Sequence, residues 1–288
     1  MKEKCIVMLS GGLDSRLTVK IMQSKGWDVI AVHFNLPFGS GCCDEKCSFN
    51  FSQMQGVKLK IFDCSKGKLL KKYLKIIKEA KHGRGAGVNP CIDCRIFMLQ
   101  EAKKFADKKN IKIIATGEVI GQRPMSQQKK QMAIIEKATK LGKRIKRPLM
   151  EYYHIQGRRR TKQMELAKKF KIDYPSPGGG CLLCEKELKK RLTYLLDKGL
   201  DEKEIKLISV GRHFLINNCW IIIGRDEKEN KILKEIQTGK LIEPKEPGPS
   251  ALIIDGTKEI ETISKKLIDA YSKNGSLQDR KKFEKWKI

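Results

Sequence analysis

The stretch Ser10-Gly-Gly-Leu-Asp-Ser15 decides the fold of this 288-residue chain. It follows the apolar run Cys5 to Leu9, which is typical of a buried strand, and precedes residues 17–22, whose apolar positions have helical spacing. In a parallel α/β sheet, ligands bind where a strand hands over to a helix. Gly11 and Gly12 let the backbone approach an anion closely, and the next helix offers unpaired N–H groups. The stretch therefore predicts an anion-binding turn.

The carboxylate of Asp14 limits the kinds of ligand that this turn can bind. Its negative charge would repel a phosphate unless Mg²⁺ lies between them, whereas Ser10 and Ser15 add hydroxyl donors. The stretch lacks both the Walker A pattern G-x-x-x-x-G-K-[ST] and the dinucleotide pattern G-x-G-x-x-G. The alternative is an ordinary glycine-rich turn. The two serines and Asp14 favour a site for Mg²⁺ and a phosphate.

Strands and helices alternate on either side of this turn. Further apolar runs typical of strands lie at residues 29–34, 58–62 and 111–115. We also expect helices throughout residues 126–171 and 182–196, and a break at residues 240–249. The alternation predicts a parallel α/β sheet in the first half of the chain.

The second half is expected to form a separate, smaller α+β domain. A Pro- and Gly-rich linker occupies residues 173–180, and a hairpin is predicted across Asn217-Asn218 before a last strand and a last helix. We therefore expect domains at residues 1–176 and 177–288.

Four of the ten cysteines in the sequence form two pairs with C-x-x-C spacing: Cys91/Cys94 and Cys181/Cys184. Each pair places two thiolates within reach of one ion, so together they indicate a metal or an iron–sulfur cluster. Disulfides are disfavoured because the chain shows no secretory signal.

The other cysteines do not share this spacing. Cys5 and Cys219 lie in apolar surroundings typical of core thiols, and Cys64 fits no single class. A Gly/Ser-rich loop, where thiols could be exposed, redox-active or metal-binding, holds Cys42, Cys43 and Cys47.

The charge of the chain indicates its partner. Lys plus Arg number 61 and Asp plus Glu 33, a formal charge of +28. Such an excess favours a polyanion, with nucleic acid ahead of an anionic membrane surface, over the lysine-rich surface of a heat-adapted protein. Residues 129–171 hold fifteen Lys/Arg against three Glu, a net +12 between the two cysteine pairs. This placement predicts RNA held across the site, and binding that weakens steeply with salt.

We predict that basic side chains of this segment contact RNA. They are Lys143, Arg144, Arg147, Arg158, Arg159 and Arg160. Arg123 lies just before the segment and could approach either a nucleotide phosphate or RNA. No apolar run reaches the roughly 18 residues of a membrane helix, and the N-terminus lacks the features of a signal peptide. A cytoplasmic location without a membrane partner is expected.

The stretch SGGLDS resembles the signature of the PP-loop ATP pyrophosphatases. Enzymes of that superfamily cleave ATP between the α and β phosphates to adenylate a substrate. The resemblance implies an adenine nucleotide alpha hydrolase-like parallel sheet with helices on both faces, with ATP and Mg²⁺ as ligands. It places ATP contacts at Ser10, Gly11, Gly12, Asp14, Ser15, Thr116 and Gly117. His33 is predicted to lie near the adenine pocket from its position alone, at the end of a strand of the sheet.

Four further motifs, in the same order along residues 4–186, resemble those of the tRNA 2-thiouridylases. Asn89-Pro-Cys-Ile-Asp-Cys94 is similar to their N-P-x-x-x-C, Thr116-Gly-Glu118 to T-G-H, and Arg147-Pro-Leu149 to F-P-L. Gly179-Gly-Cys-Leu-Leu-Cys-Glu185 is similar to G-I-C-F-I-G-E. The resemblance assigns Cys94 and Cys181, with Asp14, to catalysis. Glu118 departs from the pattern, which has His.

Cys91 is a second departure. The set Cys91, Cys94 and Cys181 resembles thiolases that hold a [4Fe-4S] cluster on three cysteines, which leaves one iron open for sulfide. Cys184 could supply a fourth ligand. Three interpretations stay open: an open cluster, a persulfide on the Cys94/Cys181 pair, and a structural Zn²⁺.

Residues 222–233 of the C-terminal segment loosely resemble the start of the NFACT-R RNA-binding domain. Together, the motifs imply a tRNA sulfurtransferase that adenylates a uridine or cytidine carbonyl oxygen and then transfers sulfur. The sulfur would come from sulfide, a cysteine desulfurase or a sulfur-carrier protein, and the protein is considered as a homodimer. The alternatives are a small-molecule adenylating ligase or sulfurtransferase, and a non-catalytic RNA-binding protein with a structural zinc.

Overall fold

The computed structural model describes residues 2–39, 45–176, 180–236, 238–244 and 246–288. The chain forms two compact units, Met1–Glu187 and Leu188–Ile288, and each is described by itself. The expected domain boundary at residues 176/177 precedes this division, and most of the linker's glycines lie outside the described residues.

The first unit is built on a five-stranded parallel sheet of order β3-β2-β1-β4-β5. The strands are β1 (Lys4–Met8), β2 (Asp28–Asn35), β3 (Lys58–Asp63), β4 (Ile113–Ala115) and β5 (Ile145–Lys146). The chain runs outward from β1 to β3 and then returns to the other side of β1. The switch point therefore lies between β1 and β4, at the carboxyl edge where ligands of such sheets bind.

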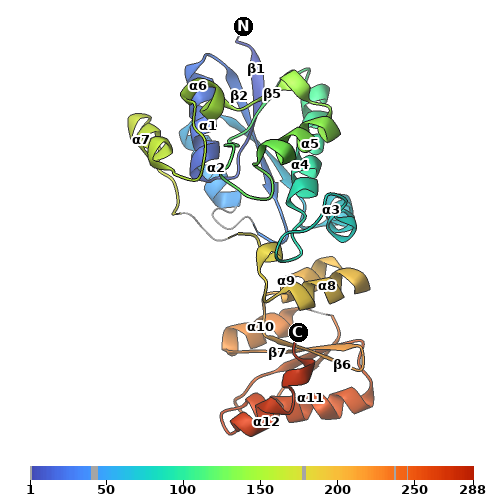
Figure 1. The fold of residues 1–288 in the computed structure, drawn as a ribbon. Helices are drawn as coiled ribbons and strands as arrows, with labels where there is room; N and C mark the ends of the chain where they lie inside the picture. Colours follow the sequence, from blue (N-terminus) through green and yellow to red (C-terminus); the bar gives the residue numbers. More distant parts are fainter. Residues whose placement is uncertain (1, 40–44, 177–179, 237, 245) are drawn as a thin grey trace. The chain divides into compact units, whose positions relative to one another are not determined.

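Helices cover both faces of this sheet, which confirms the predicted fold class. Figure 1 shows α1 (Leu13–Ser24), α2 (Glu45–Met54), α6 (Pro148–Tyr153) and α7 (Thr161–Lys169) on one side. The other side carries α3 (Gly67–Glu79), α4 (Cys91–Lys108) and α5 (Lys129–Thr139).

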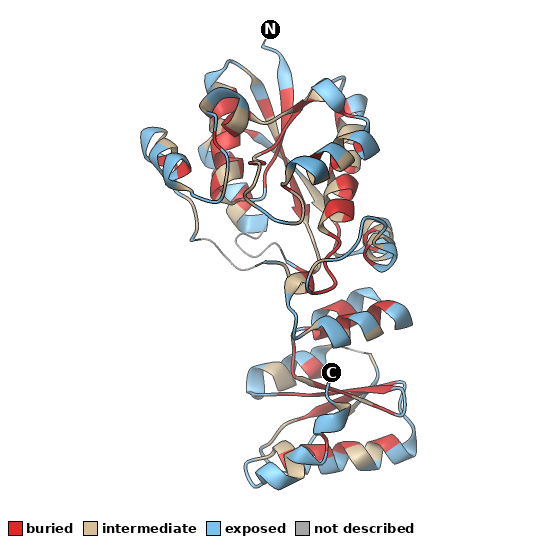
Figure 2. Ribbon diagram, in the orientation of Figure 1, coloured by how far each residue is buried: buried red, intermediate tan, exposed pale blue. Residues whose placement is uncertain are grey.

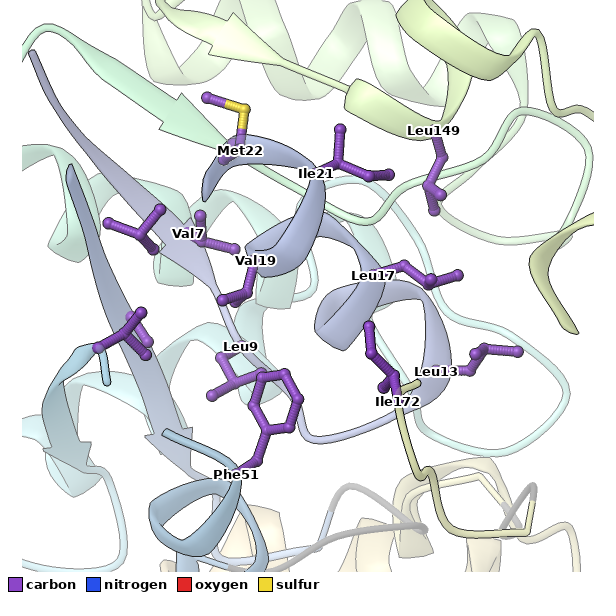
Figure 3. Close-up of a cluster of buried hydrophobic side chains, with 14 of the residues drawn as sticks. Val7, Leu9, Leu13, Leu17, Val19, Ile21, Met22, Phe51, Leu149 and Ile172 are labelled. Atoms are coloured by element: carbon purple, nitrogen blue, oxygen red, sulfur yellow. The ribbon is translucent and has the colours of Figure 1, made fainter. Parts of the chain in front are cut away.

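Helix α1 begins within the SGGLDS turn and is mostly buried. Its side chains Leu17, Val19 and Ile21 pack with Val7 of β1, Phe51 of α2 and other apolar groups in one cluster (Figure 3). The burial pattern in Figure 2 shows the same helix as mostly buried. Because burial of each such side chain stabilises the fold by about 1.5–3 kcal/mol, the start of α1 is held firmly against the sheet.

The second unit is α+β, as expected. Helices α8 (Lys189–Lys198) and α9 (Glu202–Leu207) precede an antiparallel sheet of order β6-β7-β9-β8. Its strands are β6 (Arg212–Ile216), β7 (Cys219–Ile223), β8 (Lys240–Ile242) and β9 (Ala251–Ile254), and its further helices are α10 (Glu227–Glu235), α11 (Lys258–Tyr271) and α12 (Leu277–Lys281). The predicted hairpin is confirmed: Asn217 and Asn218 have φ of +49° and +61°, the left-handed pair of a tight two-residue turn.

Three expected elements differ in the structure. Residues 126–171 are not helical throughout, because Ile145 pairs with Ile114 and adds an edge strand to the sheet. Residues 182–196 divide into a short 3₁₀ helix, η2 (Leu182–Cys184), and α8. The expected break at residues 240–249 begins with β8, which pairs with β9.

Candidate active site

The turn after β1 is closed by its own side chains. Ser15 Oγ donates to the carbonyl of Gly12 at 2.9 Å, and the Ser10 N–H donates to Ser15 Oγ at 3.2 Å. Gly11 has φ +83°, a conformation that favours glycine. Gly12 is the N-cap of α1 and makes no side-chain cap. The first N–H groups of α1 are thus left for a ligand, as an anion site requires.

In this turn, only one of the two carboxylate oxygens of Asp14 accepts a hydrogen bond. Gln122 Nε2 donates to its Oδ2 at 2.8 Å, whereas the buried Oδ1 has no hydrogen-bond partner among the described residues. Gln163, fully buried, lies near Asp14, but its own amide atoms are also without partners there. Burial raises the pKa of Asp14, although Gln122, Arg160 and Arg123 pull it down. An orphaned, buried carboxylate oxygen is the donor that Mg²⁺ takes.

His33 contacts the end of the strand that leads into the turn. Its Nδ1 lies 3.0 Å from the carbonyl of Leu9 and 3.0 Å from Ser48 Oγ, and the ring is buried. Thr116 is also buried, and its N–H donates to the carbonyl of Lys146 at 2.9 Å. The role of these two residues in ATP binding stays a prediction, and their contacts are those of groups that shape the turn.

Gly117 lies directly against the start of α1. A Cβ at this position would stand 2.7 Å from the carbonyl carbon of Asp14, closer than side chains tolerate. Only glycine therefore lets residues 116–118 pack beside the turn.

The structure brings the two C-x-x-C pairs together. Cys91 and Cys94 lie in the first turn of α4, while Cys181 is the N-cap of η2 and Cys184 is its last residue. The N–H of Val88 donates to the carbonyl of Leu183 at 2.9 Å, so the segment before α4 packs backbone to backbone against η2. Cys181 Sγ and Cys184 Sγ are 3.8 Å apart.

The four thiols share one electrostatic environment. Burial is the main cause that raises the pKa of each of them, to about 11 for Cys94 and Cys184. Negative charge on Cys184 also raises the pKa of Cys91, and charge on Cys94 raises that of Cys181. A free thiolate is therefore scarce here at neutral pH unless a cation or metal stabilises it.

The donor chemistry of these thiols fits an iron–sulfur cluster or zinc. Within the described part of the chain, however, no group of three or more His, Cys, Asp or Glu side chains has the spacing of a metal site.

Other cysteines lie outside this set of four. Cys47 is on α2, where its Sγ accepts a hydrogen bond from Arg16 at 2.9 Å, while Cys42 and Cys43 lie outside the described residues. Cys5 and Cys219 are buried, as expected. Cys64 is buried near Cys94, and burial raises its pKa to about 12.

Two contacts to the thiols were not predicted. The hydroxyl of Tyr73, a fully buried residue of α3, lies 3.4 Å from Cys94 Sγ, and Asn89 Nδ2 donates to Cys91 Sγ at 3.2 Å. In the sequence, Tyr73 belongs to an apolar stripe with Leu70 and Ile77, which is the pattern of a core residue. Asn89 was part of the N-P-x-x-x-C motif, but its contact could not be read from spacing.

Arg123 connects the turn with the thiols. Its guanidinium lowers the pKa of Asp14 and also those of Cys91 and Cys184. Arg123, which is exposed, is thus near enough to the SGGLDS turn and to both C-x-x-C pairs to act on their charges.

Glu118, which stands where the 2-thiouridylase pattern has His, is the centre of a buried ion network. Arg95 Nε lies 2.8 Å from its Oε1, and Arg147 Nε 3.2 Å from its Oε2. Burial alone would raise the pKa of Glu118, but Arg95 and Arg147 outweigh it and lower the pKa. Arg95 follows Cys94 directly, so this network holds the first turn of α4.

The six basic residues that we predicted to contact RNA differ in their internal partners and in their exposure. Arg144 pairs with Asp107 at 2.7 Å, and Arg147 pairs with Glu118 and Glu136, so both have internal partners. Arg160 is half-buried near Asp14. The exposed ones are Lys143, Arg158 and Arg159. Contact of all six with RNA stays a prediction.

The fold and the turn agree with the PP-loop class that the motifs indicated. The model of the family described as thiamine biosynthesis protein (ThiI) matches residues 1–169, more than half of the chain, and the chain belongs to this family. A second model, of the NFACT protein RNA binding domain, matches residues 211–282, which confirms that resemblance.

Several curated proteins are similar to this chain. The tRNA-specific 2-thiouridylase MnmA of Nitratiruptor sp. is 28% identical over 124 residues, covering 41% of this chain and 35% of that protein. A probable tRNA sulfurtransferase of Methanosarcina mazei is 26% identical over 124 residues, 41% of this chain and 29% of that protein. The chain thus spans about a third of the length of such relatives. The resemblance to tRNA thiolases is confirmed at the level of the family.

Among solved structures, a 4-thiouridine synthetase–RNA complex with bound ATP is similar, with 17% identity and a TM-score of 0.45. The match covers 88% of this chain and 55% of that chain.

The Tyr73 hydroxyl is expected to stabilise the Cys94 thiolate. In reduced, metal-free protein, Tyr73→Phe should slow alkylation of Cys94 about tenfold at alkaline pH below its pKa of about 11, because a hydrogen bond to the thiolate is lost. Mass spectrometry of the labelled peptide measures the rate. Tyr194→Phe, whose hydroxyl donates to Asn218 in the second unit, is the matched control and should leave the rate unchanged. Equal rates for Tyr73→Phe and wild type would contradict the assignment.

Glu118 is expected to support the fold as an ion. Glu118→Gln leaves two arginines without their carboxylate and should lower the free energy of unfolding by about 3–5 kcal/mol at neutral pH in urea denaturation. The folded pKa of Glu118 lies below its ordinary value of 4.5, so this contribution is present above pH 4.5 and is lost as pH falls through the folded pKa. The difference in free energy of unfolding between the variant and wild type should therefore narrow as the pH falls below 4.5. Glu235→Gln, an exposed change, is the control; a gap independent of pH would refute the role.

Proposed function

We propose that this protein is an ATP-dependent tRNA sulfurtransferase, or thiolase. The observation that carries the proposal is that one short segment contacts both parts of the site: Gly117 packs against the backbone of Asp14, and Glu118 pairs with Arg95, the residue after Cys94. Membership of the ThiI family and the second unit's match to an RNA binding domain support the reaction and the substrate class.

ATP would bind along the turn. The N–H groups at the start of α1 and the backbone of Gly11 and Gly12 suit its phosphates, with the hydroxyls of Ser10 and Ser15 beside them. The unpartnered Oδ1 of Asp14 fits Mg²⁺, which would screen the carboxylate from the phosphates. Arg123 and Arg160 add positive charge near Asp14 for the same purpose.

The chemistry needs two displacements. A uridine or cytidine carbonyl oxygen attacks the α-phosphorus, an O–P bond forms, and pyrophosphate leaves with the electron pair. A sulfur nucleophile then forms the C–S bond, and AMP leaves with the former carbonyl oxygen. Adenylation is required because the carbonyl oxygen alone is a poor leaving group. The target base must be unstacked to reach these atoms.

The cysteines would deliver the sulfur. A persulfide on Cys181 or Cys94 is one route. In the other, Cys91, Cys94 and Cys181 would hold a [4Fe-4S] cluster, which when bound would supply one coordination position for sulfide; ligation by Cys184 as well would close that position. A Zn²⁺ on the four thiols would be structural instead. Sulfide would be the donor for the cluster route. The persulfide route needs sulfane sulfur from a cysteine desulfurase or a sulfur-carrier protein; the other cysteine of the Cys94/Cys181 pair would then displace the transferred sulfur from the carrier cysteine, and an external thiol would reduce the resulting disulfide.

The proposed RNA partner is tRNA, contacted by the second unit and by the basic segment at residues 129–171. No helix among the described residues is both long and apolar enough to cross a membrane. The cytoplasmic location and the homodimer stay predictions.

Sulfur incorporation into bulk tRNA tests the proposal. After anaerobic reconstitution with iron and sulfide, wild type with ATP should form a thionucleoside detectable by mass spectrometry. Cys94→Ala and Cys181→Ala should abolish it, because each removes a sulfur ligand or carrier. Asp14→Asn should lower the rate by about a hundredfold or more, because the charge that holds Mg²⁺ is lost.

Cys219→Ser is the matched control: this thiol donates to the carbonyl of Asp255 in the second unit, and the variant should stay active. Full activity of Cys94→Ala or Cys181→Ala would overturn the proposal. Iron and zinc analysis of the same anaerobic preparation separates the cluster, structural zinc and metal-free persulfide forms.

A further inference from the structure

Two arginines of the second unit contact one tyrosine ring. Arg212 Cζ lies 5.0 Å from the centroid of Tyr271, and Arg280 Cζ lies 5.5 Å from it. All three residues are half-buried. Tyr271 in turn packs on the buried ring of Phe214, with centroids 5.6 Å apart. We call Arg212, Tyr271 and Arg280 the arginine–tyrosine cluster.

The backbone builds this cluster from three separate elements. Arg212 begins β6, Tyr271 ends α11, and Arg280 lies in α12. Gly275 makes the tight return between the two helices, since a Cβ there would stand 2.1 Å from the carbonyl oxygen of Ala270. Arg280 Nε donates to that same carbonyl at 3.0 Å. The second arginine is thereby fixed over Tyr271.

The positive charge of the cluster is not neutralised from within. Arg212 and Arg280 form no ion pair with a carboxylate in the part of the chain that the structure describes, and their hydrogen bonds go to the carbonyls of Gly224 and Ala270. The carboxylate of Glu229, which is close to Arg212, already accepts hydrogen bonds from Arg225 and from the N–H of Gly211. Burial lowers the pKa of Arg212, and the charges of Arg225 and Arg280 lower it further.

Bringing two unpaired guanidinium groups to one ring costs free energy through their repulsion, and a bound anion would offset that cost. A guanidinium presents paired N–H donors that match phosphate oxygens, and its face stacks on an aromatic ring. The ring thus holds the arginines while leaving their edges for a ligand.

We propose that Arg212 and Arg280 together bind a backbone phosphate of RNA, with Tyr271 as the platform that positions them. The choice of RNA rests on the proposed function, because the matched RNA binding domain at residues 211–282 contains all three residues. A phosphate contact positions the RNA without reading its sequence.

Salt-dependent binding of the full-length protein to an unmodified tRNA transcript tests this site. Arg212→Gln and Arg280→Gln should each weaken binding about three- to tenfold, and each should make the slope of log K against log salt shallower by about 0.7–0.9. Lys266→Gln, an exposed change on α11, is the matched control and should change neither value. Arg280→Lys keeps the positive charge but lacks the planar guanidinium that stacks on Tyr271. It should therefore recover only part of the affinity that Arg280→Gln loses.

The possible outcomes distinguish a failure of the phosphate site from a failure of the proposed function. If wild type binds tRNA with a salt-dependent Kd but both glutamine variants match it, the phosphate site is overturned and RNA binding stands. If wild type does not bind tRNA, both fail. If poly-glutamate displaces tRNA from wild type as well as a competing tRNA does at equal charge, the site takes acidic polypeptides and the RNA assignment is overturned. Circular dichroism melting confirms that the variants are folded.

Discussion

The close approach of Gly117 to the backbone of Asp14 is the constraint on which the site depends. It seats the loop after β4 against the start of α1, at the switch point of the sheet. From that loop, Gln122 reaches back to the Asp14 carboxylate. In the other direction, Glu118 binds Arg95, the residue that follows Cys94. One glycine therefore allows the phosphate turn and the thiols to be held by a single short segment.

Burial and charge oppose each other throughout this site. Burial raises the pKa values of Asp14 and of all four thiols, which favours their neutral forms. In the proposed function, the ionised forms would bind Mg²⁺, carry sulfur or ligate metal. Arg123 and the Tyr73 hydroxyl shift the balance toward them. Such tension between environment and function is typical of catalytic sites.

Much of the fold and part of the site could be predicted from the sequence. The strands of both sheets that carry strong apolar runs were found, and the SGGLDS turn falls at the sheet's switch point. The edge strand at Ile145 was missed because two residues carry no periodicity. The Tyr73–Cys94 contact was missed because a polar tip on an apolar stripe looks like core. The internal carboxylate partners of Arg144 and Arg147 are set by tertiary structure, which a count of charges does not contain.

The central claim is that the phosphate turn and the thiols form one site that shares Arg123. Alkylation rates of Cys91 and Cys184 in reduced, metal-free protein, measured with and without Mg²⁺-ATP, test it most directly. Arg123 lowers the pKa of both thiols, so phosphates that engage Arg123 should raise those pKa values and slow alkylation several-fold. In Arg123→Gln the effect of ATP should largely disappear. Unchanged rates in wild type with ATP demonstrably bound would contradict the account.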